Sequence, residues 1–269
     1  MIQPHTARPH CAQYLYVLGI GSRWQNNELR YSLRSLDAFC PMPKHIYIAG
    51  ERPEFINWGR SDGITHIPLP EIGGSKVQHV GRKLIGAMPY LRERDFVLMN
   101  DDFILTRAHD CTREAGPFAW GRRHAGLLTE RLASIKPKYR TSRVSYGANA
   151  AHGSMYYRAI LKSFQFLQTV GEQPWLAYNV HEPMDLSADL VLNTGAACPF
   201  WEGYSFRILY GNLHSCEFDR SVPAVVDMKI AGQELIPAGV NSISLSSAVR
   251  DPMQTWLANR FQKKSRWEK

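Results

Sequence analysis

The feature that most constrains the fold of this chain is an alternation of β-prone runs and helical spacing in its first part. Between the first two runs, leucines recur at helical spacing from Leu29 to Leu36, with Asn26 or Asn27 as the N-cap. A second helical segment, residues 80–91, leads into the last run. The four runs, each ended by glycine, proline or polar residues, are YLYVLG (14–19), HIYIAG (45–50), ITHIP (64–68) and DFVLM (95–99).

Strand, helix and strand in this order predict parallel βαβ crossovers. We therefore expect an α/β fold with an open, mostly parallel sheet and flanking helices. A chain of 269 residues with 44% apolar content can form one such domain over residues 1–269. At the other end, Asp251 and Pro252 predict a helix start, and the helix should dock through an apolar stripe. The tail after it is expected either to contact a polyanion or to fray in solvent.

Cysteine usage and hydropathy bear on the cellular setting. The five cysteines are odd in number and widely spaced, without a CxxC pair, so neither a disulfide framework nor a zinc ribbon is expected. The N-terminal residues MIQPHTARPHC lack an apolar signal core, and no stretch approaches the roughly 18 apolar residues of a membrane span. These features predict a cytoplasmic protein, in the host cytoplasm if phage-encoded, without a membrane partner.

Ligands of open α/β sheets bind beyond the carboxyl ends of the strands. This rule brings GIGSRWQNNE (19–28), after the first strand, close to Asn100, Asp101 and Asp102, after the last. Trp24 stands where a dinucleotide fingerprint needs its third glycine, and no suitably placed acid closes the second strand, so a nicotinamide site is disfavoured. A glycine turn before a helix start instead suits a phosphate or diphosphate.

The two adjacent acids allow two interpretations. Asp and Asn are common where strands end, so they could form an ordinary turn. However, apolar residues on both sides place them at a buried strand end, and burying unpaired charge is costly. We therefore favour a site for Mg²⁺ or Mn²⁺, which take oxygen ligands and bridge substrate phosphates. Arg30 and Arg34, four residues apart, lie either on a solvated flank of the helix or at an anion site.

The net charge of +8 is concentrated in one segment. Between Arg107 and Arg143, nine lysines and arginines stand against three acids, so this segment carries nine minus three, or +6. A polyanion such as nucleic acid would explain the concentration, because Lys and Arg contacts to phosphate dominate affinity for such ligands. The alternative is a solvated basic face.

Several motifs together resemble conserved regions of the Stealth family of sugar-phosphate transferases, particularly compact phage-type and bacterial relatives. They span nearly the whole chain in the expected order. The later ones include a histidine-proline region and a Lys-Ser-aromatic-Glu ending. The motifs are SRWQNNELRYSLRSL (22–36), HIYIAGERPEF (45–55), FVLMNDDFIL (96–105), YNVHEPM (178–184) and RFQKKSRWEK (260–269).

The resemblance implies a core of the glycosyltransferase A type, a nucleotide-sugar donor such as a UDP-sugar, and Asp101 and Asp102 as the acidic metal motif. It also places His181 on the family's later histidine. The chain departs from the family where Arg82 and Lys83 replace a glutamate, and in lacking a Trp-Val-Asp-Gly opening, so simple glycosyl transfer is as compatible as sugar-1-phosphate transfer. Residues 14–110 would form the nucleotide-sugar-binding half and 111–269 the acceptor half.

Residue roles follow from this interpretation. Asp102 is the expected direct metal ligand, Asp101 or Asn100 would complete the site or hold the donor ribose, and His181 would be a general base or metal ligand. His214 is a weaker metal candidate. The expected donor-binding residues are Gly19, Gly21, Ser22, Arg23, Asn27, Arg30, Lys76, Asn100 and Asp101, and the expected acceptor-binding residues are Arg122, Arg123, Lys138, Arg140, Arg207, Lys263 and Lys264.

Three functions remain open for the acceptor side. The first is a glycosyltransferase that acts on a hydroxymethylated pyrimidine in phage-type DNA, motivated by the +6 segment. The second is a Stealth-type sugar-1-phosphate or glycosyl transferase of a capsule or other surface polysaccharide. The third is a nucleic-acid-binding module with a degenerate donor site, which the intact acids Asp101 and Asp102 argue against.

Overall fold

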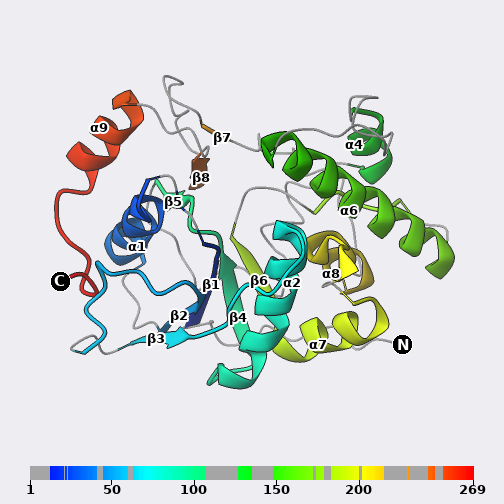
Figure 1. The fold of residues 1–269 in the computed structure, drawn as a ribbon, viewed down its shortest axis with the longest axis horizontal. Coiled ribbons are helices and arrows are strands. Elements are labelled where there is room, and N and C mark those ends of the chain that lie inside the picture. The colour runs from blue at the N-terminus through cyan, green and yellow to red at the C-terminus, as the bar shows by residue number, and fades with distance from the viewer. Residues whose placement is uncertain are drawn as a thin grey trace.

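The protein folds into two sheets with helices on both sides (Figure 1). The larger sheet consists of β1 (Gln13–Leu18), β2 (His45–Gly50), β3 (Ile64–Ile67), β4 (Asp95–Met99) and β6 (Met184–Ser187), in the order β3-β2-β1-β4-β6. The computed structural model describes residues 13–20, 22, 24–40, 45–59, 63–106, 127–134, 148–171, 174–178, 183–199, 202–214, 229–230, 242–245 and 251–269.

The first four strands of the large sheet run parallel, as the sequence predicts. β1 pairs with β2 on one side and with β4 on the other, and β2 pairs with β3. β6 is antiparallel to β4. The chain therefore moves outward from β1 to β3 and then returns to β4 on the opposite side of β1. This reversal creates a topological switch point between β1 and β4, at the carboxyl ends of both strands.

Two hydrophobic clusters cover the two faces of this sheet because successive strand side chains alternate in direction. Tyr14, Tyr16 and Ile48 face α1 (Asn27–Phe39), whose Leu29 and Leu33 are fully buried. The opposite face packs against α2 (Lys76–Ala87), α6 (Ala148–Val170), α7 (Ala188–Ala197) and α8 (Phe206–His214). A further short helix, α4 (Leu128–Ser134), packs near α6 (Figure 1).

The start of α1 departs from the expected N-cap. Asn26 occupies the cap position, but its backbone is left-handed, with φ of 59°, and its side chain makes no capping bond. The hydroxyl of Ser22 instead accepts hydrogen bonds from the backbone N–H of Asn26 at 2.8 Å and of Trp24 at 3.2 Å. Ser22 therefore organises the loop before the helix.

α2 begins earlier than the periodic segment 80–91 predicts. Ser75 and Gln78 form a capping box, so the helix starts at Lys76. It ends at Ala87, and a 3₁₀ turn (η1, Met88–Tyr90) containing Pro89 follows. The capping signal explains the earlier start, because it satisfies orphan backbone donors without needing apolar spacing.

A small sheet links the first and last parts of the chain. β5 (Phe103–Leu105) pairs antiparallel with β8 (Ser242–Leu245), and β7 (Lys229–Ile230) pairs parallel with β8. α9 (Asp251–Arg260) packs over this sheet through Met253 and Leu257, so the predicted docking of the C-terminal helix is confirmed. None of these three strands is predicted from the sequence, because β5 meets its partner β8 only in the folded chain.

The tail after α9 is anchored, so the expectation that it frays is wrong for its last residues, while contact with a polyanion stays a prediction. Trp267 is fully buried beside α1, and Arg266 donates from its backbone and its Nε to the carboxylate of Asp37 at 3.0 and 2.7 Å. The exposed residues of the tail are Gln262, Lys263, Lys264, Arg266 and Lys269. Within the described part of the chain, no helix has the length and apolarity needed to span a membrane.

Candidate functional site

Asn100, Asp101 and Asp102 form a turn at the switch point. They follow β4 directly, and the register that pairs Tyr16 with Met99 brings this turn beside the end of β1. β5 starts immediately afterwards, so the turn joins the two sheets. The acids therefore lie where open α/β sheets bind ligands.

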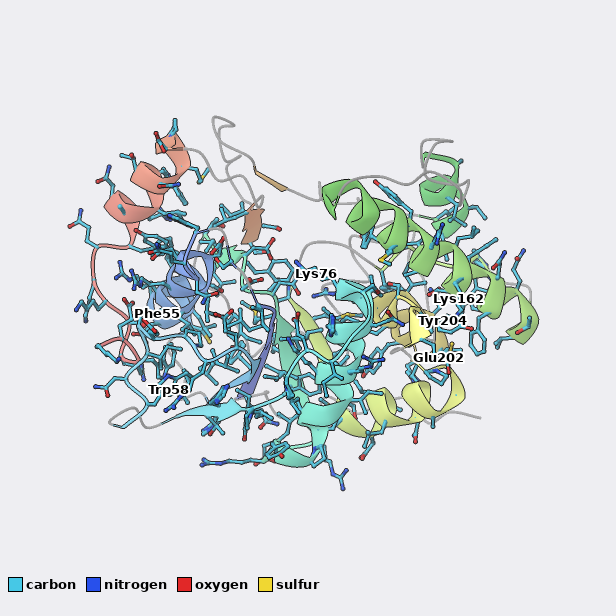
Figure 2. All side chains as sticks on the ribbon, viewed as in Figure 1. Phe55, Trp58, Lys76, Lys162, Glu202 and Tyr204 are labelled. Carbon is cyan, nitrogen blue, oxygen red and sulfur yellow. The ribbon has the colours of Figure 1, made fainter. Side chains whose placement is uncertain are left out.

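The environment of Asp101 strongly disfavours its charged form. Burial raises the pKa of this carboxyl from its ordinary 3.8 to about 7, and the negative charges of Asp102 and Glu28 add to the effect. The ammonium of Lys76 acts in the opposite direction. Lys76 occupies the first turn of α2, and Figure 2 shows it in the middle of the molecule.

The neighbours of Asp101 in the turn are fixed by distant segments. Asp102 accepts a 2.6 Å hydrogen bond from the hydroxyl of Ser244 on β8, and its backbone carbonyl accepts from the N–H of Leu245 at 2.9 Å. The side-chain oxygen of Asn100 accepts from Nη2 of Arg207 on α8 at 3.3 Å. The turn is therefore held from both the small sheet and α8.

The loop after β1 is also tightly organised. The hydroxyl of Ser22 donates to Oε2 of Glu28 at 2.8 Å while it accepts from the loop backbone. Gln25 and Asn26 are both left-handed, with φ of 55° and 59°, which is uncommon for residues other than glycine. Such conformations concentrate at ligand sites because the surrounding structure must stabilise them.

A partly buried ion pair between Lys83 of α2 and Glu71 supports this loop. Nζ of Lys83 donates to the backbone oxygen of Leu18 and to Oε1 of Glu71, both at 2.7 Å. Burial alone would raise the pKa of Glu71, but the bond and charge of Lys83 outweigh this and lower it. The same oxygen accepts weakly from the N–H of Ile20 at 3.4 Å. The pair therefore joins α2 to the end of β1.

An acidic residue does follow the second strand directly, contrary to the sequence interpretation. Glu51 directly follows Gly50, the last residue of β2. Gly50 has φ of +120°, and a Cβ there would lie 2.1 Å from the oxygen of Leu18, so the close approach of β2 to β1 requires glycine. Glu51 does not have the expected spacing from the glycine loop, so the sequence interpretation missed it. Its position directly after a strand was the signal that could have identified it.

The structure brings several of the predicted donor and metal residues to this edge. Arg30 instead lies along the flank of α1: its guanidinium packs over Phe55 at 4.7 Å, its Nη1 donates to Asn27 at 2.8 Å and its Nε is 3.6 Å from Glu268. The predicted residues at the strand ends and the adjoining helix starts are Gly19, Ser22, Asn27, Lys76, Asn100, Asp101, Asp102 and Arg207.

His214 lies elsewhere. It ends α8, where its Nε2 is 2.6 Å from the hydroxyl of Thr194 on α7, and burial lowers its pKa. The structure does not bring it together with Asp101 and Asp102. Lys264 donates to the backbone oxygen of Lys269, and Lys263 is exposed on the same tail after α9. The remaining predicted site residues lie outside the described residues: Gly21, Arg23, Arg122, Arg123, Lys138, Arg140 and His181.

The donor set at the turn fits a hard divalent cation. Within the ranges that the structure describes, no three His, Cys, Asp or Glu side chains are placed to hold a metal ion by themselves. Mg²⁺ and Mn²⁺, however, are commonly held by one or two carboxylates together with waters and substrate phosphates. A cation would also offset the burial and the repulsion by Asp102 that together raise the pKa of Asp101. Asp101 and Asp102 can therefore hold such an ion when a diphosphate is bound.

Comparison with known proteins gives weak structural similarities. No family model and no curated protein matches the chain. Among solved structures, the galactosyltransferase LgtC with donor and acceptor sugar analogues shares 8% identity over 75% of this chain and 70% of that chain, with a TM-score of 0.36. The apo-form glycosyltransferase GlyE of Streptococcus pneumoniae TIGR4 shares 15% identity over 72% and 44%, with a TM-score of 0.30. Similarities this low do not define the fold, which follows from the strand order itself.

Proposed function

We propose that the chain is a sugar transferase that binds a nucleotide-sugar donor at the carboxyl ends of β1 and β4. The observation that supports it most is the pair Asp101 and Asp102 at the topological switch point, opposite the loop after β1. The start of α2 adds Lys76, whose charge acts on Asp101. The resemblance of several sequence motifs to the Stealth family points to the same donor class.

Different groups at this edge would bind different parts of the donor. The backbone N–H groups of the loop after β1 and the start of α1 would bind the diphosphate, because helix starts and left-handed loops favour anions. Lys76 would neutralise further phosphate charge. Asp101 and Asp102 would hold Mn²⁺ or Mg²⁺, which stabilises the charge that develops on the leaving diphosphate.

In the reaction, the bond between the sugar's anomeric carbon and the diphosphate breaks and a new bond to an acceptor oxygen forms. The acceptor hydroxyl loses its proton to a general base, a role that we assign to His181. In sugar-1-phosphate transfer, the bond that breaks would instead lie within the diphosphate.

The acceptor on this proposal is a hydroxyl on a modified, hydroxymethylated pyrimidine of phage-type DNA. The charge of the segment from Arg107 to Arg143 supports this acceptor. The segment carries nine minus three, or +6, and it follows soon after the acidic turn in the sequence. Basic residues such as Arg122, Lys138 and Arg140 would hold the phosphate backbone while the base is presented. A surface polysaccharide offers no phosphate backbone for these residues unless it is itself phosphorylated.

Mass spectrometry of two acceptors tests this function. Hydroxymethylated DNA and a mixture of oligosaccharides are incubated with nucleotide sugars and Mn²⁺, with the Asp102→Asn variant as the inactive control. We expect the mass of one sugar to be added to the DNA by the unmodified protein only. Addition to the oligosaccharides alone would establish the Stealth-type polysaccharide alternative, and a gain of sugar plus phosphate would identify sugar-1-phosphate transfer. Transfer to neither acceptor, with no donor cleavage, would contradict the proposal.

A further inference from the structure

A carboxylate of the chain itself occupies an anion-binding position at this edge of the sheet. Oε1 of Glu71, in the segment before α2, accepts a 2.7 Å hydrogen bond from Nζ of Lys83 and a weak one, at 3.4 Å, from the backbone N–H of Ile20. The same oxygen lies close to Gly19, where a Cβ would come within 3.3 Å of it. One oxygen of Glu71 therefore contacts both an ammonium of α2 and the loop after β1.

The groups around this oxygen are of the kind that bind phosphate. Backbone N–H groups of a loop that follows a strand, together with a lysine ammonium, form a common phosphate site. His79, one helical turn before Lys83, also lies near the carboxylate. Burial raises the pKa of Glu71, but the bond and charge of Lys83, with smaller contributions from His79 and the N–H of Ile20, lower it below its ordinary value. The position therefore favours a negative charge.

This position belongs to the same edge as the acidic turn. Lys76 and Lys83 are seven residues apart, nearly two helical turns, so they lie on one face of α2. The charge of Lys76 acts on Asp101, after β4, while Nζ of Lys83 donates to the backbone oxygen of Leu18 at the end of β1. The face of α2 that carries both lysines therefore borders the proposed donor site at β1 and at β4.

The Glu71 carboxylate can be exchanged for another anion. Its side chain is 24% exposed, whereas that of Lys83 is 3% exposed, so solvent reaches the pair from the side of Glu71. The backbone that follows is held separately, because Nη1 of Arg82 donates to the oxygens of Ile72 and Gly73 at 2.6 and 2.9 Å. Rotation of the glutamate side chain alone would therefore uncover the ammonium and the backbone donor behind it.

We propose that Glu71 is a placeholder for a phosphate group of the donor, and that this phosphate replaces the carboxylate beside Lys83 and the N–H of Ile20 when the donor binds. The inference rests on the proposed function, because it concerns the same donor site. A phosphate carries more negative charge than a carboxylate and offers more acceptor oxygens, so it competes successfully for Lys83. Before the donor binds, Glu71 keeps the buried ammonium paired, and its displacement lowers the apparent affinity for nucleotide.

Titration calorimetry with a panel of nucleoside diphosphates and Mn²⁺ tests the placeholder. The unmodified protein is compared with Glu71→Gln, which removes the charge, and with Glu71→Asp, which keeps the charge on a side chain too short to reach Lys83. Glu54→Gln, at an exposed acid in the loop after β2, is the control for net charge. We expect both Glu71 variants to bind the nucleotide about tenfold more tightly, because no carboxylate has to be displaced, and Glu54→Gln to bind it as the unmodified protein does.

A double variant tests which group the phosphate gains. Adding Lys83→Gln to Glu71→Gln should abolish the increase in affinity, because the phosphate then finds no ammonium at this position. Circular dichroism confirms that each variant is folded. The two single Glu71 variants decide the question by themselves if the double variant does not fold.

The outcomes separate this inference from the function on which it rests. Weaker or unchanged binding by Glu71→Gln, a gain in Glu71→Gln that is absent in Glu71→Asp, or a gain that persists in the folded double variant would each overturn the placeholder and leave the donor site standing. Absence of nucleoside diphosphate binding by the unmodified protein and by both Glu71 variants would overturn both.

Discussion

Asp101 is held in the folded protein with its charge poorly compensated. Its carboxyl is near Asp102 and Glu28, and its folded pKa is about 7 against an ordinary value of 3.8. Between these two pH values the folded state retains a proton that the unfolded state has lost. The free energy of unfolding therefore falls as pH rises from about 4 to 7 and stays low above that range.

The first prediction is that Asp101→Asn stabilises the metal-free protein at high pH. Removing the ionisable group abolishes the free-energy cost of ionising Asp101 in the folded state. The melting temperature at pH 8 should therefore rise by about 3 °C or more, while at pH 4 the variant should differ little. Thermal unfolding in EDTA at several pH values measures this. Asp189→Asn, at an exposed carboxylate, is the control. A variant that is less stable than the unmodified protein at pH 8 would contradict the raised pKa.

At the residue scale, the sequence predicts the acids but not their partners. Asp101 and Asp102 could be identified because they interrupt an apolar run at a strand end. Ser244 binds Asp102 across 142 positions, and only the folded chain brings the two together. Glu51 was missed for a different reason: it lacks the spacing expected after a glycine loop.

At the element scale, a buried ion pair between Arg34 and Glu268 holds α1 against the C-terminal tail. Nε and Nη2 of Arg34 donate to the two carboxylate oxygens of Glu268 at 2.7 and 2.8 Å, and the backbone N–H of Ser265 donates to the same carboxylate at 3.0 Å. Burial would raise the pKa of Glu268, but these bonds outweigh it and lower the pKa. The tail thus stabilises the helix whose first turn borders the proposed donor site.

The second prediction concerns this pair. Glu268→Gln should destabilise the protein at pH 7 by about 3 kcal/mol, because it leaves the guanidinium of Arg34 buried without its counter-charge. Since the lowered pKa stabilises the fold only while Glu268 is ionised, the difference should shrink as pH falls below about 4. Urea unfolding measures the effect, and Lys263→Gln on the exposed part of the tail is the control. Equal stability of both variants at pH 7 would contradict the account.

The elements differ in how far sequence predicts them. α1 is predicted correctly because Leu29, Leu33 and Leu36 share one face, and the strands of the parallel sheet are predicted because each is a short apolar run. β6 and β8 are as short as β3, but they lie outside the alternation of strands and helices that identifies β3 in the sequence. The burial of Trp267 depends on packing against distant segments such as α1, which local sequence does not reveal.

At the scale of the whole molecule, the proposed acceptor rests on the charge distribution. The fold is confirmed as an α/β fold with a mostly parallel sheet, while the basic segment from Arg107 to Arg143 lies largely outside the described residues. Its role therefore stays a prediction from composition.

The third prediction is that duplex DNA binds with an affinity that falls steeply with salt concentration. If several basic residues contact phosphates, the logarithm of the association constant should fall linearly with the logarithm of salt concentration, and Arg122→Ala or Arg140→Ala should weaken binding and reduce the slope. Fluorescence anisotropy with a labelled duplex measures both. Arg94→Ala, at an exposed arginine outside the basic segment, is the control. Binding that is absent at low salt, or independent of salt, would rule out a DNA acceptor.

The central claim is that the turn at the switch point binds a nucleoside diphosphate together with a divalent cation. Thermal stabilisation by nucleoside diphosphates with and without Mn²⁺ tests it most directly, on the unmodified protein and on Asp102→Asn, which keeps an acceptor for Ser244. We predict a rise in melting temperature that requires both nucleotide and Mn²⁺ and that is lost in the variant. An equal rise in both proteins, or none in the unmodified protein, would contradict the assignment of this site.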